Sequence, residues 1–285
     1  MGIPYAEVIG DPVAHSKSPV IHKFWLGKLG IEGDYRTTRV EAAGLADYFA
    51  ARRTDPAWRG CNVTIPHKQA VIPLLDELTH PAEAIGAVNI VTLTARRRRL
   101  VGHNSDGPGF LDLLSGWPGL DRLYRLASVI GTGGGAAAVT WALLQHGIFT
   151  LVYSRDYARA ERLLRRLGET DMDFAQLLEG LAADGPEMAE RPDSIDLLIN
   201  ASPLGMRGFP PLEVSLKGWP PDTLVCDLVY DPVETPLLRT ARERGHPVLS
   251  GLDMLVAQAA RAFYLFFEAH PPRQHDAELR ELLTS

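Results

Sequence analysis

At positions 126 to 136 the chain reads Leu126-Ala127-Ser128-Val129-Ile130-Gly131-Thr132-Gly133-Gly134-Gly135-Ala136, and this stretch decides the fold of the 285-residue protein. An apolar strand runs into a glycine-rich turn, after which Ala137 to His146 predicts a helix ended by Gly147. Gly131 permits a tight turn, Gly133 lets the backbone approach a pyrophosphate, and Ala136 keeps helix and strand close. The pattern predicts a dinucleotide site formed by Gly131, Thr132, Gly133, Gly134, Gly135 and Ala136.

Strands and helices alternate on both sides of this turn. Downstream of it we expect strands at 149–154, 195–200 and 223–228, and a helix at 158–167. Upstream we expect strands at 5–10, 35–40 and 60–65, a hairpin of 89–94 with 99–103, and helices at 18–29, 43–52 and 68–78. The stretch 168–192 is mixed and predicts no single element.

This alternation predicts an α/β protein, and a chain of this length favours two domains. We expect an N-terminal α/β domain with a mainly parallel sheet at 1–105, and a Rossmann-like dinucleotide-binding domain at 106–250. A long apolar helix, with Asp253 as its cap, runs to His270. We expect 251–285, which contains this helix, to join the first domain.

Composition and charge exclude several classes of function. With 46% hydrophobic residues, 22% charged residues and a net charge of −6, the chain is typical of a soluble globular protein and has no nucleic-acid footprint. No apolar run reaches the length of a membrane span, and Cys61 and Cys226 have no metal-ligand or redox spacing. We expect a cytoplasmic monomer or homodimer that binds small molecules, without metal, nucleic acid or membrane. The run Arg96 to Arg99 is interpreted as a solvated hairpin tip.

The stretch Asn62-Val63-Thr64-Ile65-Pro66-His67-Lys68 carries polar groups from a strand into the expected helix at 68–78. Alternation puts Asn62 and Thr64 on one face of the strand, and Pro66 suits the first position of a helix. Lys68 then lies in the first turn, where the positive end of the helix dipole disfavours a cation. An amine held against that field has a reason to pass protons. A surface lysine beside a cap is the alternative.

The end of the strand at 149–154 indicates which nicotinamide cofactor binds. A site for NAD places a carboxylate there to bond the ribose, whereas this chain has Ser154, Arg155 and, further on, Arg159. Arginine binds a 2′-phosphate bidentately, so NADP is the expected cofactor and NAD the weaker alternative. Asp156 opposes this, because its carboxylate repels a phosphate or neutralises an arginine. A charged helix start capped by Asp156 is the structural alternative.

Two hydroxyls precede the first helix. Ser18 followed by Pro19 is typical of a helix cap, whereas Ser16 has no capping role that the sequence indicates. Beside a helix N-terminus, the pair suits a small carboxylate.

Other polar residues stand at the ends of elements or inside apolar ones. Asn89 opens a strand, and Asp106 lies at the domain boundary. Gln258 interrupts the apolar C-terminal helix, where a core glutamine bonded to backbone is the alternative. The combined inventory suits a small polyhydroxylated acid and comprises Ser16, Ser18, Asn62, Thr64, Lys68, Asn89, Asp106 and Gln258.

These motifs resemble the shikimate dehydrogenase family along essentially the whole chain. The segments that carry the resemblance are Ala14-His15-Ser16-Lys17-Ser18-Pro19, Asn62 to Lys68, Gly86-Ala87-Val88-Asn89, Asn104-Ser105-Asp106-Gly107, Gly131 to Ala136, Asn200-Ala201-Ser202-Pro203-Leu204-Gly205-Met206 and Gly251 to Ala260. Several motifs in one order are far more specific than any single one. The resemblance implies NADP-dependent, reversible reduction of 3-dehydroshikimate to shikimate in chorismate and aromatic amino-acid biosynthesis.

The resemblance also implies roles for single residues. Lys68 and Asp106 would be the catalytic pair, and Ser16 and Ser18 would hold the substrate carboxylate. The rest of the substrate would be contacted by Asn62, Thr64, Asn89, Tyr230 and Gln258. The cofactor would be bound by the glycine turn together with Ser154, Arg155, Arg159, Ser202 and Gly251, with Ser202 to Met206 along the nicotinamide.

Departures from the family pattern leave alternatives open. The family often has threonine at the positions of Ile90, Ser105 and Ser202, and Asn-Arg-Thr at 154–156. Ile90 removes a polar group beside Asn89, and Asp156 weakens the preference for NADP. The paired serines favour shikimate over quinate only modestly, because one methyl group discriminates weakly. The alternatives are a quinate/shikimate dehydrogenase with relaxed NAD or NADP use, a methylene-tetrahydrofolate dehydrogenase-like enzyme and a non-catalytic ligand-sensing homologue.

Overall fold

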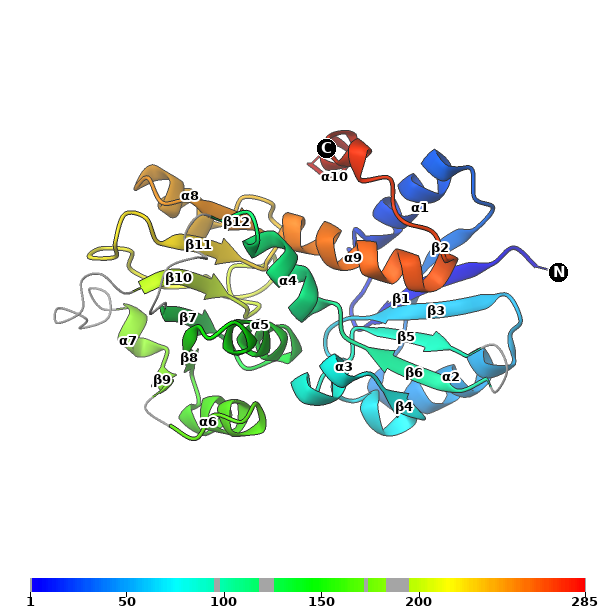
Figure 1. Cartoon of the computed structure of the whole chain (residues 1–285), viewed down its shortest axis with the longest axis horizontal. Coiled ribbons are helices and arrows are strands. Elements are labelled where there is room, and N and C mark those ends of the chain that lie inside the picture. The colour runs from blue at the N-terminus through cyan, green and yellow to red at the C-terminus, as the bar shows by residue number, and fades with distance from the viewer. Residues whose placement is uncertain (1, 95–97, 118–125, 172–173, 183–194, 285) are drawn as a thin grey trace. The chain divides into compact units, whose positions relative to one another are not determined.

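The computed structural model describes residues 2–94, 98–117, 126–171, 174–182 and 195–284. The chain divides into two compact units, which are Met1–Ser105 with Val256–Ser285, and Asp106–Leu255 (Figure 1). Each unit has its own six-stranded sheet. The predicted α/β class is therefore confirmed.

The first unit is built on a mixed sheet in the order β2-β1-β3-β5-β6-β4. Its strands are β1 (Tyr5–Gly10), β2 (Asp34–Arg39), β3 (Trp58–Val63), β4 (Glu77–Leu78), β5 (Ile90–Leu93) and β6 (Leu100–His103). The strand β1 pairs in parallel with both β2 and β3, and β4 pairs in parallel with β6. Because β5 runs antiparallel to both β3 and β6, the predicted hairpin is confirmed.

Helices of the first unit cover this sheet, and the C-terminal segment is among them. They are α1 (Ser18–Leu29), η1 (Ala42–Gly44), α2 (Leu45–Thr54), η2 (Ile72–Leu74), α3 (His80–Ile85), η5 (Arg273–His275) and α10 (Asp276–Thr284), with most of α9 (Gly251–Phe267). Phe263 and Phe266 of α9 are buried with Tyr35 of β2 and Trp25 of α1. The C-terminal helix thus returns to the first unit.

The second unit carries a fully parallel sheet in the order β12-β11-β10-β7-β8-β9. Its strands are β7 (Leu126–Ile130), β8 (Phe149–Ser154), β9 (Ala175–Leu177), β10 (Ile195–Asn200), β11 (Leu224–Asp227) and β12 (Val248–Ser250). Its helices are α4 (Asp106–Leu114), α5 (Gly134–Gln145), α6 (Tyr157–Arg166), α7 (Glu179–Ala182), α8 (Pro236–Glu243) and the start of α9. This strand order is the dinucleotide-binding one, and it reverses between β7 and β10. The Rossmann-like fold is confirmed.

The helix predicted at 68–78 is wrong. Turns follow β3, and only η2 and the short strand β4 lie in that range. The reason is Pro73, which has no N–H to donate and whose ring clashes with the carbonyl four residues earlier in a helix. Lys68 therefore does not sit at a helix start, and the dipole argument for it fails.

Several helix boundaries also differ from prediction. The helix α5 begins at Gly134, three residues earlier than expected. The expected cap Asp253 is inside α9, where it forms a capping box with Ser250. The Ser250 hydroxyl donates to Asp253 Oδ2 at 2.6 Å, and the Asp253 N–H donates to Ser250 Oγ at 3.4 Å.

Two other predictions concern less regular stretches. Within 168–192 the structure describes β9 and α7. The basic hairpin tip lies partly outside the described residues, because Arg96 and Arg97 are not described.

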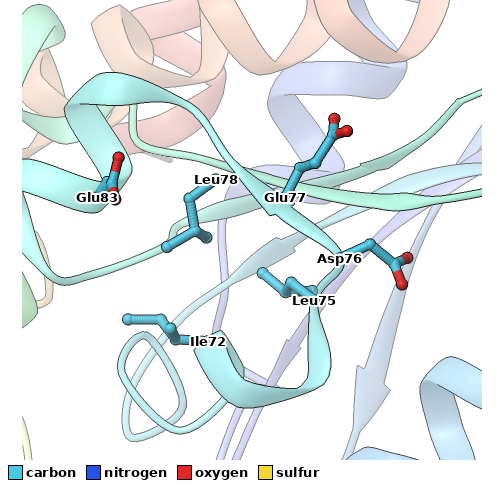
Figure 2. Close-up of a pocket in the computed structure, with 6 residues that line it drawn as sticks. All are labelled: Ile72, Leu75, Asp76, Glu77, Leu78 and Glu83. Carbon is cyan, nitrogen blue, oxygen red and sulfur yellow. The ribbon is translucent and has the colours of Figure 1, made fainter.

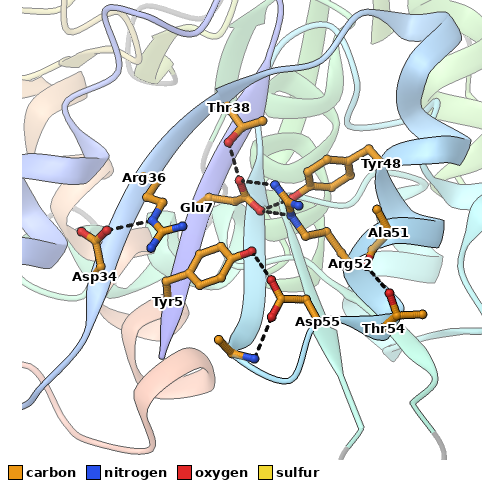
Figure 3. A network of polar contacts seen from close by, with 11 residues as sticks. Tyr5, Glu7, Asp34, Arg36, Thr38, Tyr48, Ala51, Arg52, Thr54 and Asp55 are labelled. Atoms are coloured by element: carbon orange, nitrogen blue, oxygen red, sulfur yellow. Dashed lines mark hydrogen bonds and ion pairs between the residues drawn. The ribbon is translucent and has the colours of Figure 1, made fainter. Parts of the chain in front are cut away.

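A buried carboxylate, Glu7 of β1, joins this strand to the neighbouring strand β2 and to the helix α2 through hydrogen bonds (Figure 3). It accepts hydrogen bonds from Arg52 Nε at 2.6 Å, from the Tyr48 hydroxyl at 2.8 Å and from the Thr38 hydroxyl. These donors come from α2 and β2. The bond to Glu7 is the main cause that raises the pKa of Arg52 above its ordinary value. A charge buried in a protein is costly unless an opposite charge pairs with it, and Arg52 supplies that pairing for Glu7.

Replacing Arg52 by methionine would leave Glu7 charged and unpaired. We expect Arg52→Met to lower the free energy of unfolding by about 3 kcal/mol. Adding Glu7→Gln removes the charge and keeps an acceptor for Tyr48, so the double variant should be more stable than Arg52→Met alone. Urea denaturation followed by circular dichroism measures both variants. A double variant no more stable than the single one contradicts the explanation.

Candidate active site

In the second unit, the ends of β7 and β10 approach each other closely. Gly131 follows β7 with a φ of 119°, and a Cβ there would lie 2.9 Å from the carbonyl oxygen of Ala201, just after β10. The Ala201 N–H donates to the Ile130 carbonyl at 2.9 Å. Only glycine fits position 131. Strand order reverses at this point, which is where open parallel sheets bind ligands.

The start of α5 suits a pyrophosphate. Gly133 occupies the cap position, and a Cβ there would meet no protein atom within 4 Å. Gly134, Gly135 and Ala136 form the first turn, whose N–H groups have no partner inside the helix. No acidic side chain lies in that turn, and the helix dipole places its positive end there. These donors and this open face fit the phosphates of a dinucleotide.

The arginines after β8 are not equivalent. Arg159 Nε lies 3.5 Å from Asp156 Oδ2, in an exposed ion pair. Arg155 is exposed and has neither an ion pair nor a hydrogen bond with any residue that the structure describes. Ser154 is buried, and its Oγ accepts the Asp156 N–H at 3.1 Å. Asp156 occupies the cap position of α6 without a side-chain capping bond, so a charged helix start stays an alternative to a phosphate site.

The other predicted residues of this unit leave the same edge of the sheet. Ser202 follows β10, Tyr230 follows β11, and Gly251 follows β12. Gly251 packs directly on the carbonyl groups of Leu228 and Val229, so that a side chain there has no room. The structure thus gives Gly251 a packing role, and its contact with the cofactor stays a prediction.

In the first unit, three predicted carboxamides share one buried network. Asn89 Nδ2 donates to Gln258 Oε1 at 3.2 Å and to Ser105 Oγ at 2.9 Å, while Asn89 Oδ1 accepts the Ser105 N–H at 2.8 Å. Asn62 Nδ2 donates to the Asn89 carbonyl at 3.3 Å. Asn62, Asn89 and Gln258 are therefore held together, although Gln258 is far from the other two in sequence.

Tyr35 orients Asn62, and sequence reasoning missed it. Its hydroxyl donates to Asn62 Oδ1 at 2.6 Å, so the amide must present its nitrogen on the other side. The Tyr35 ring stacks on His22, with ring centres 4.0 Å apart. His22 is fully buried, and burial lowers its pKa to about 3, so it stays neutral at neutral pH. No sequence pattern linked these residues, because only the pairing of β1 with β2 and β3 brings them together.

Lys68 lies in a loop that is fixed at three points. The Thr64 N–H donates to the Ile9 carbonyl at 2.9 Å, and a ring nitrogen of His67 lies 2.6 Å from the Val40 carbonyl. The Lys68 carbonyl accepts the Val88 N–H at 2.7 Å, which fixes Lys68 beside the residue preceding Asn89. Both Thr64 and Lys68 are half-buried. Backbone bonds to neighbouring segments thus position the loop in place of a helix.

The start of the first helix differs from the prediction that Ser18 is its cap. The helix α1 begins at Ser18 with Lys17 in the cap position, so Ser18 is not its cap. The Ser18 N–H donates to Ser16 Oγ at 3.3 Å, and Ser16 therefore serves the helix start. The helix has the predicted bounds, and the Ser16 hydroxyl meets one of the N–H groups that the first turn leaves free. Ser18 is buried and Ser16 half-buried.

Asp106 is the first residue of α4 and is buried, directly after Ser105. Lys68 belongs to the first unit and Asp106 to the second. Their pairing stays a prediction.

A pocket elsewhere in the first unit contains none of these residues (Figure 2). It is lined by Ile72, Leu75, Asp76, Glu77, Leu78 and Glu83. Arg53 pairs with Asp76 at 2.7 Å, and Arg99 pairs with Glu77. Three carboxylates in the lining make it a poor site for an acidic substrate. Within the described ranges, no group of three or more His, Cys, Asp or Glu residues could hold a metal ion.

Comparisons with known proteins agree with this geometry. The family model for the shikimate dehydrogenase substrate-binding domain matches residues 8–91, and that for the shikimate 5′-dehydrogenase C-terminal domain matches residues 251–278. A shikimate dehydrogenase (NADP(+)) of Sphingopyxis alaskensis is 45% identical over 99% of this chain and 97% of its own length. The chain belongs to the shikimate dehydrogenase family.

Solved structures of this family have the same fold. The shikimate 5-dehydrogenase of Thermus thermophilus, in complex with NADP(H) and shikimate, has a TM-score of 0.80 and 33% identity, covering 99% of this chain and 100% of that one. The quinate dehydrogenase of Corynebacterium glutamicum, in complex with NAD, has a TM-score of 0.81 and 30% identity, covering 98% of this chain and 99% of that one. The solved structures that resemble this chain thus include one complex with NADP(H) and one with NAD.

Two glycines of the turn should respond differently to alanine. Gly133→Ala places a methyl group in open space, so we expect an unchanged melting temperature and NADP binding weakened by at least about tenfold. Gly131→Ala meets the Ala201 carbonyl and a left-handed φ, so we expect a lower melting temperature as well. Thermal unfolding and calorimetric titration with NADP measure the pair. Unchanged NADP affinity in Gly133→Ala contradicts the assignment of this turn.

Proposed function

We propose that this chain is an NADP-dependent shikimate dehydrogenase, which reversibly reduces 3-dehydroshikimate to shikimate in chorismate and aromatic amino-acid biosynthesis. The observation that carries the proposal is the buried network of Asn62, Asn89 and Gln258. Locked carboxamides offer neutral donors and acceptors in fixed directions, which suits the hydroxyl groups of a ring better than it suits a charged or apolar ligand. The 45% identical relative, a shikimate dehydrogenase (NADP(+)), supports the same reaction.

The substrate is held by neutral groups in this proposal. Ser16 and Ser18, at the N-terminus of α1, bind the carboxylate, which the positive end of the helix dipole favours. Asn62, Asn89 and Gln258 bond the ring hydroxyls, and Thr64 and Tyr230 contact the remaining surface. Tyr35 and Ser105 orient the carboxamides before substrate arrives, so little ordering is needed on binding.

Proton transfer is assigned to Lys68. The chemistry that NADPH supplies when bound is hydride transfer. As negative charge develops on the carbonyl oxygen at C3 of the substrate, the Lys68 ammonium stabilises it and delivers a proton from Nζ. In the oxidation, the neutral amine accepts the proton of the substrate hydroxyl. Asp106 orients Lys68 and the reacting hydroxyl.

A cytoplasmic monomer or homodimer is part of the proposal. Cys61 and Cys226 are buried free thiols, which supports a reducing compartment. Among the helices of the described ranges, none has the length and apolar character that a membrane span requires.

A quinate/shikimate dehydrogenase with relaxed cofactor use is the second candidate. The ion pair between Arg159 and Asp156 favours it, because it draws one cation away from a 2′-phosphate. Absorbance at the nicotinamide band, with shikimate or quinate and with NADP or NAD, separates the two candidates. The first requires the highest kcat/KM for shikimate with NADP.

The role of Lys68 is tested by Lys68→Met, which keeps the length of the side chain and removes the amine. We expect kcat to fall by roughly 10² to 10⁴ while shikimate still binds. The matched control is Lys23→Met, because Lys23 is an exposed lysine of the same unit, paired with Asp34. Steady-state kinetics and fluorescence titration measure the two properties. Unchanged turnover in Lys68→Met would falsify the role.

The preference for NADP is tested at the end of β8. We expect Arg155→Ala to weaken the binding of NADP by about tenfold to a hundredfold and to leave the binding of NAD nearly unchanged, because only NADP carries the 2′-phosphate. Arg159→Ala should have a smaller effect, since its guanidinium already pairs with Asp156. The KM of each cofactor for each variant is the measurement. Equal losses for NADP and NAD in Arg155→Ala would remove Arg155 from the phosphate site.

A further inference from the structure

Asp227, the last residue of β11, gathers three donors on one buried carboxylate. Its Oδ1 accepts Asn200 Nδ2 at 2.9 Å and the Val229 N–H at 3.0 Å, and its Oδ2 accepts the Thr235 hydroxyl at 2.7 Å. Asp227, Asn200 and Thr235 are all at most 1% exposed. The carboxylate therefore joins the end of β10, the backbone that leads to Tyr230 and the cap of α8.

Asn200 transmits the orientation of this carboxylate to the loop after β10. An ionised Asp227 only accepts hydrogen bonds, so Asn200 must turn its nitrogen towards it. Asn200 Oδ1 then faces the loop, where it accepts the Ser202 N–H at 3.1 Å and the Ser202 hydroxyl at 2.7 Å. Ser202 Oγ in turn accepts the Leu204 N–H at 3.2 Å. These bonds form a relay from Asp227 through Asn200 to Ser202 and Leu204, in which the Asn200 amide can point in only one direction.

The place of this relay on the sheet indicates what it serves. The glycine turn after β7 suits the pyrophosphate, and Arg155 after β8 suits the adenosine phosphate. A dinucleotide lies across the point where strand order reverses, so its nicotinamide half falls over the ends of β10 and β11. Ser202 and Tyr230 leave the sheet at these two ends.

We propose that Asp227 is a positioning residue for the nicotinamide half of the site, acting through Asn200 on the Ser202 loop and through Val229 on the backbone that carries Tyr230. Asp227 touches neither ligand in this role. The inference rests on the proposed NADP-dependent function.

The surroundings of Asp227 allow its charge to be switched by pH. Burial raises the pKa of Asp227 from its usual 3.8 to about 6, against the lowering effect of its three hydrogen bonds. Within the described ranges no cation pairs with it. The neighbouring residue along β11 is Cys226, and burial and the charge of Asp227 raise the pKa of its thiol. The elements β10, β12 and α8 pack against β11. Of these, β12 has no charged residue, and the charged residue of β10, Asp196, lies near the end opposite to Asn200. The helix α8 buries Leu237, Leu238 and Ala241, and its charged residues are Arg239, Arg242 and Glu243.

The two consequences of protonating Asp227 have opposite signs. A carboxyl whose pKa is higher in the folded chain binds its proton more readily when folded, so its contribution to stability grows as pH falls from about 6 to 3.8. The relay to Ser202 weakens over the same change, because a neutral carboxyl holds the Asn200 amide less strongly than a carboxylate does, while the Ser202 N–H and the Leu204 carbonyl still set the direction of that amide. A positioning role and a purely structural role therefore respond differently to pH.

The test compares two ligands that share every phosphate, NADP and 2′-phospho-ADP-ribose, which lacks only nicotinamide. Calorimetric titration of the full chain at pH 8 gives both dissociation constants. We expect Asp227→Asn, whose amide has one acceptor oxygen for three donors, to weaken NADP by about tenfold and the analogue by less than about twofold. Thr235→Val is the matched control, because it removes a donor from the same carboxylate away from the loop. It should lower the melting temperature and leave both dissociation constants unchanged.

The outcomes separate cleanly. Equal weakening of both ligands in Asp227→Asn, or a nicotinamide-selective loss in Thr235→Val, overturns the inference while leaving the proposed function intact. A wild-type chain that binds neither ligand overturns the proposed function and this inference with it. Should Asp227→Asn not fold, the wild-type chain supplies the test. Its preference for NADP over the analogue must fall as pH is lowered from 8 to 5, and a constant preference overturns the inference.

Discussion

Both units depend on one constraint, which is that the ends of neighbouring parallel strands meet at the same edge of a sheet. In the second unit, the segments after β7, β8, β10, β11 and β12 all leave from one edge, because every pair in that sheet is parallel. The close approach of Gly131 to Ala201 fixes the centre of this edge.

The mixed sheet of the first unit obeys the same constraint by another route. Ser16 and Ser18 follow β1, and Thr64 and Lys68 follow the parallel strand β3. The strand β5 runs antiparallel to β3, so it begins at the edge where β3 ends, and this places Asn89 there. The strand β6 reverses again and brings Ser105 to the same edge. Because β5 is antiparallel, Asn89, which precedes a strand, lies at the same edge as the residues that follow β1, β3 and β6.

Buried polar groups in this protein serve two different purposes. The network around Glu7 pairs a charge with Arg52 and closes on itself, which suits a structural role. The networks around Asn89 and Asp227 instead orient residues that lie beside a candidate ligand site, and each leaves an amide only one direction. Fixed directions are what a site for ring hydroxyls and nicotinamide requires, because reorienting an amide on binding would cost affinity.

Sequence patterns predicted elements best where the pattern was local. Glycine spacing, apolar runs and alternation predicted β7, β8, the β5–β6 hairpin and the α/β class, since each depends on neighbouring residues. The helix predicted at 68–78 is wrong because Pro73 cannot sit inside a helix and turns follow Pro66. Tyr35, Asn200 and Asp227 were not predicted to orient a site, because each acts on a residue that is far away in the chain.

The sequence by itself determined the α/β class, the glycine turn and the inventory of polar side chains, because these follow from residue type and spacing. Only the tertiary structure decided which of those side chains meet, and in which direction each amide points. The physical reason is that a hydrogen bond depends on a few tenths of an ångström and on orientation, and only strand pairing and helix packing set these across the chain. Lys68 shows both sides of this division. Its residue type is suited to proton transfer, but the loop that holds it is positioned by backbone bonds from Ile9 and Val88, not by a helix.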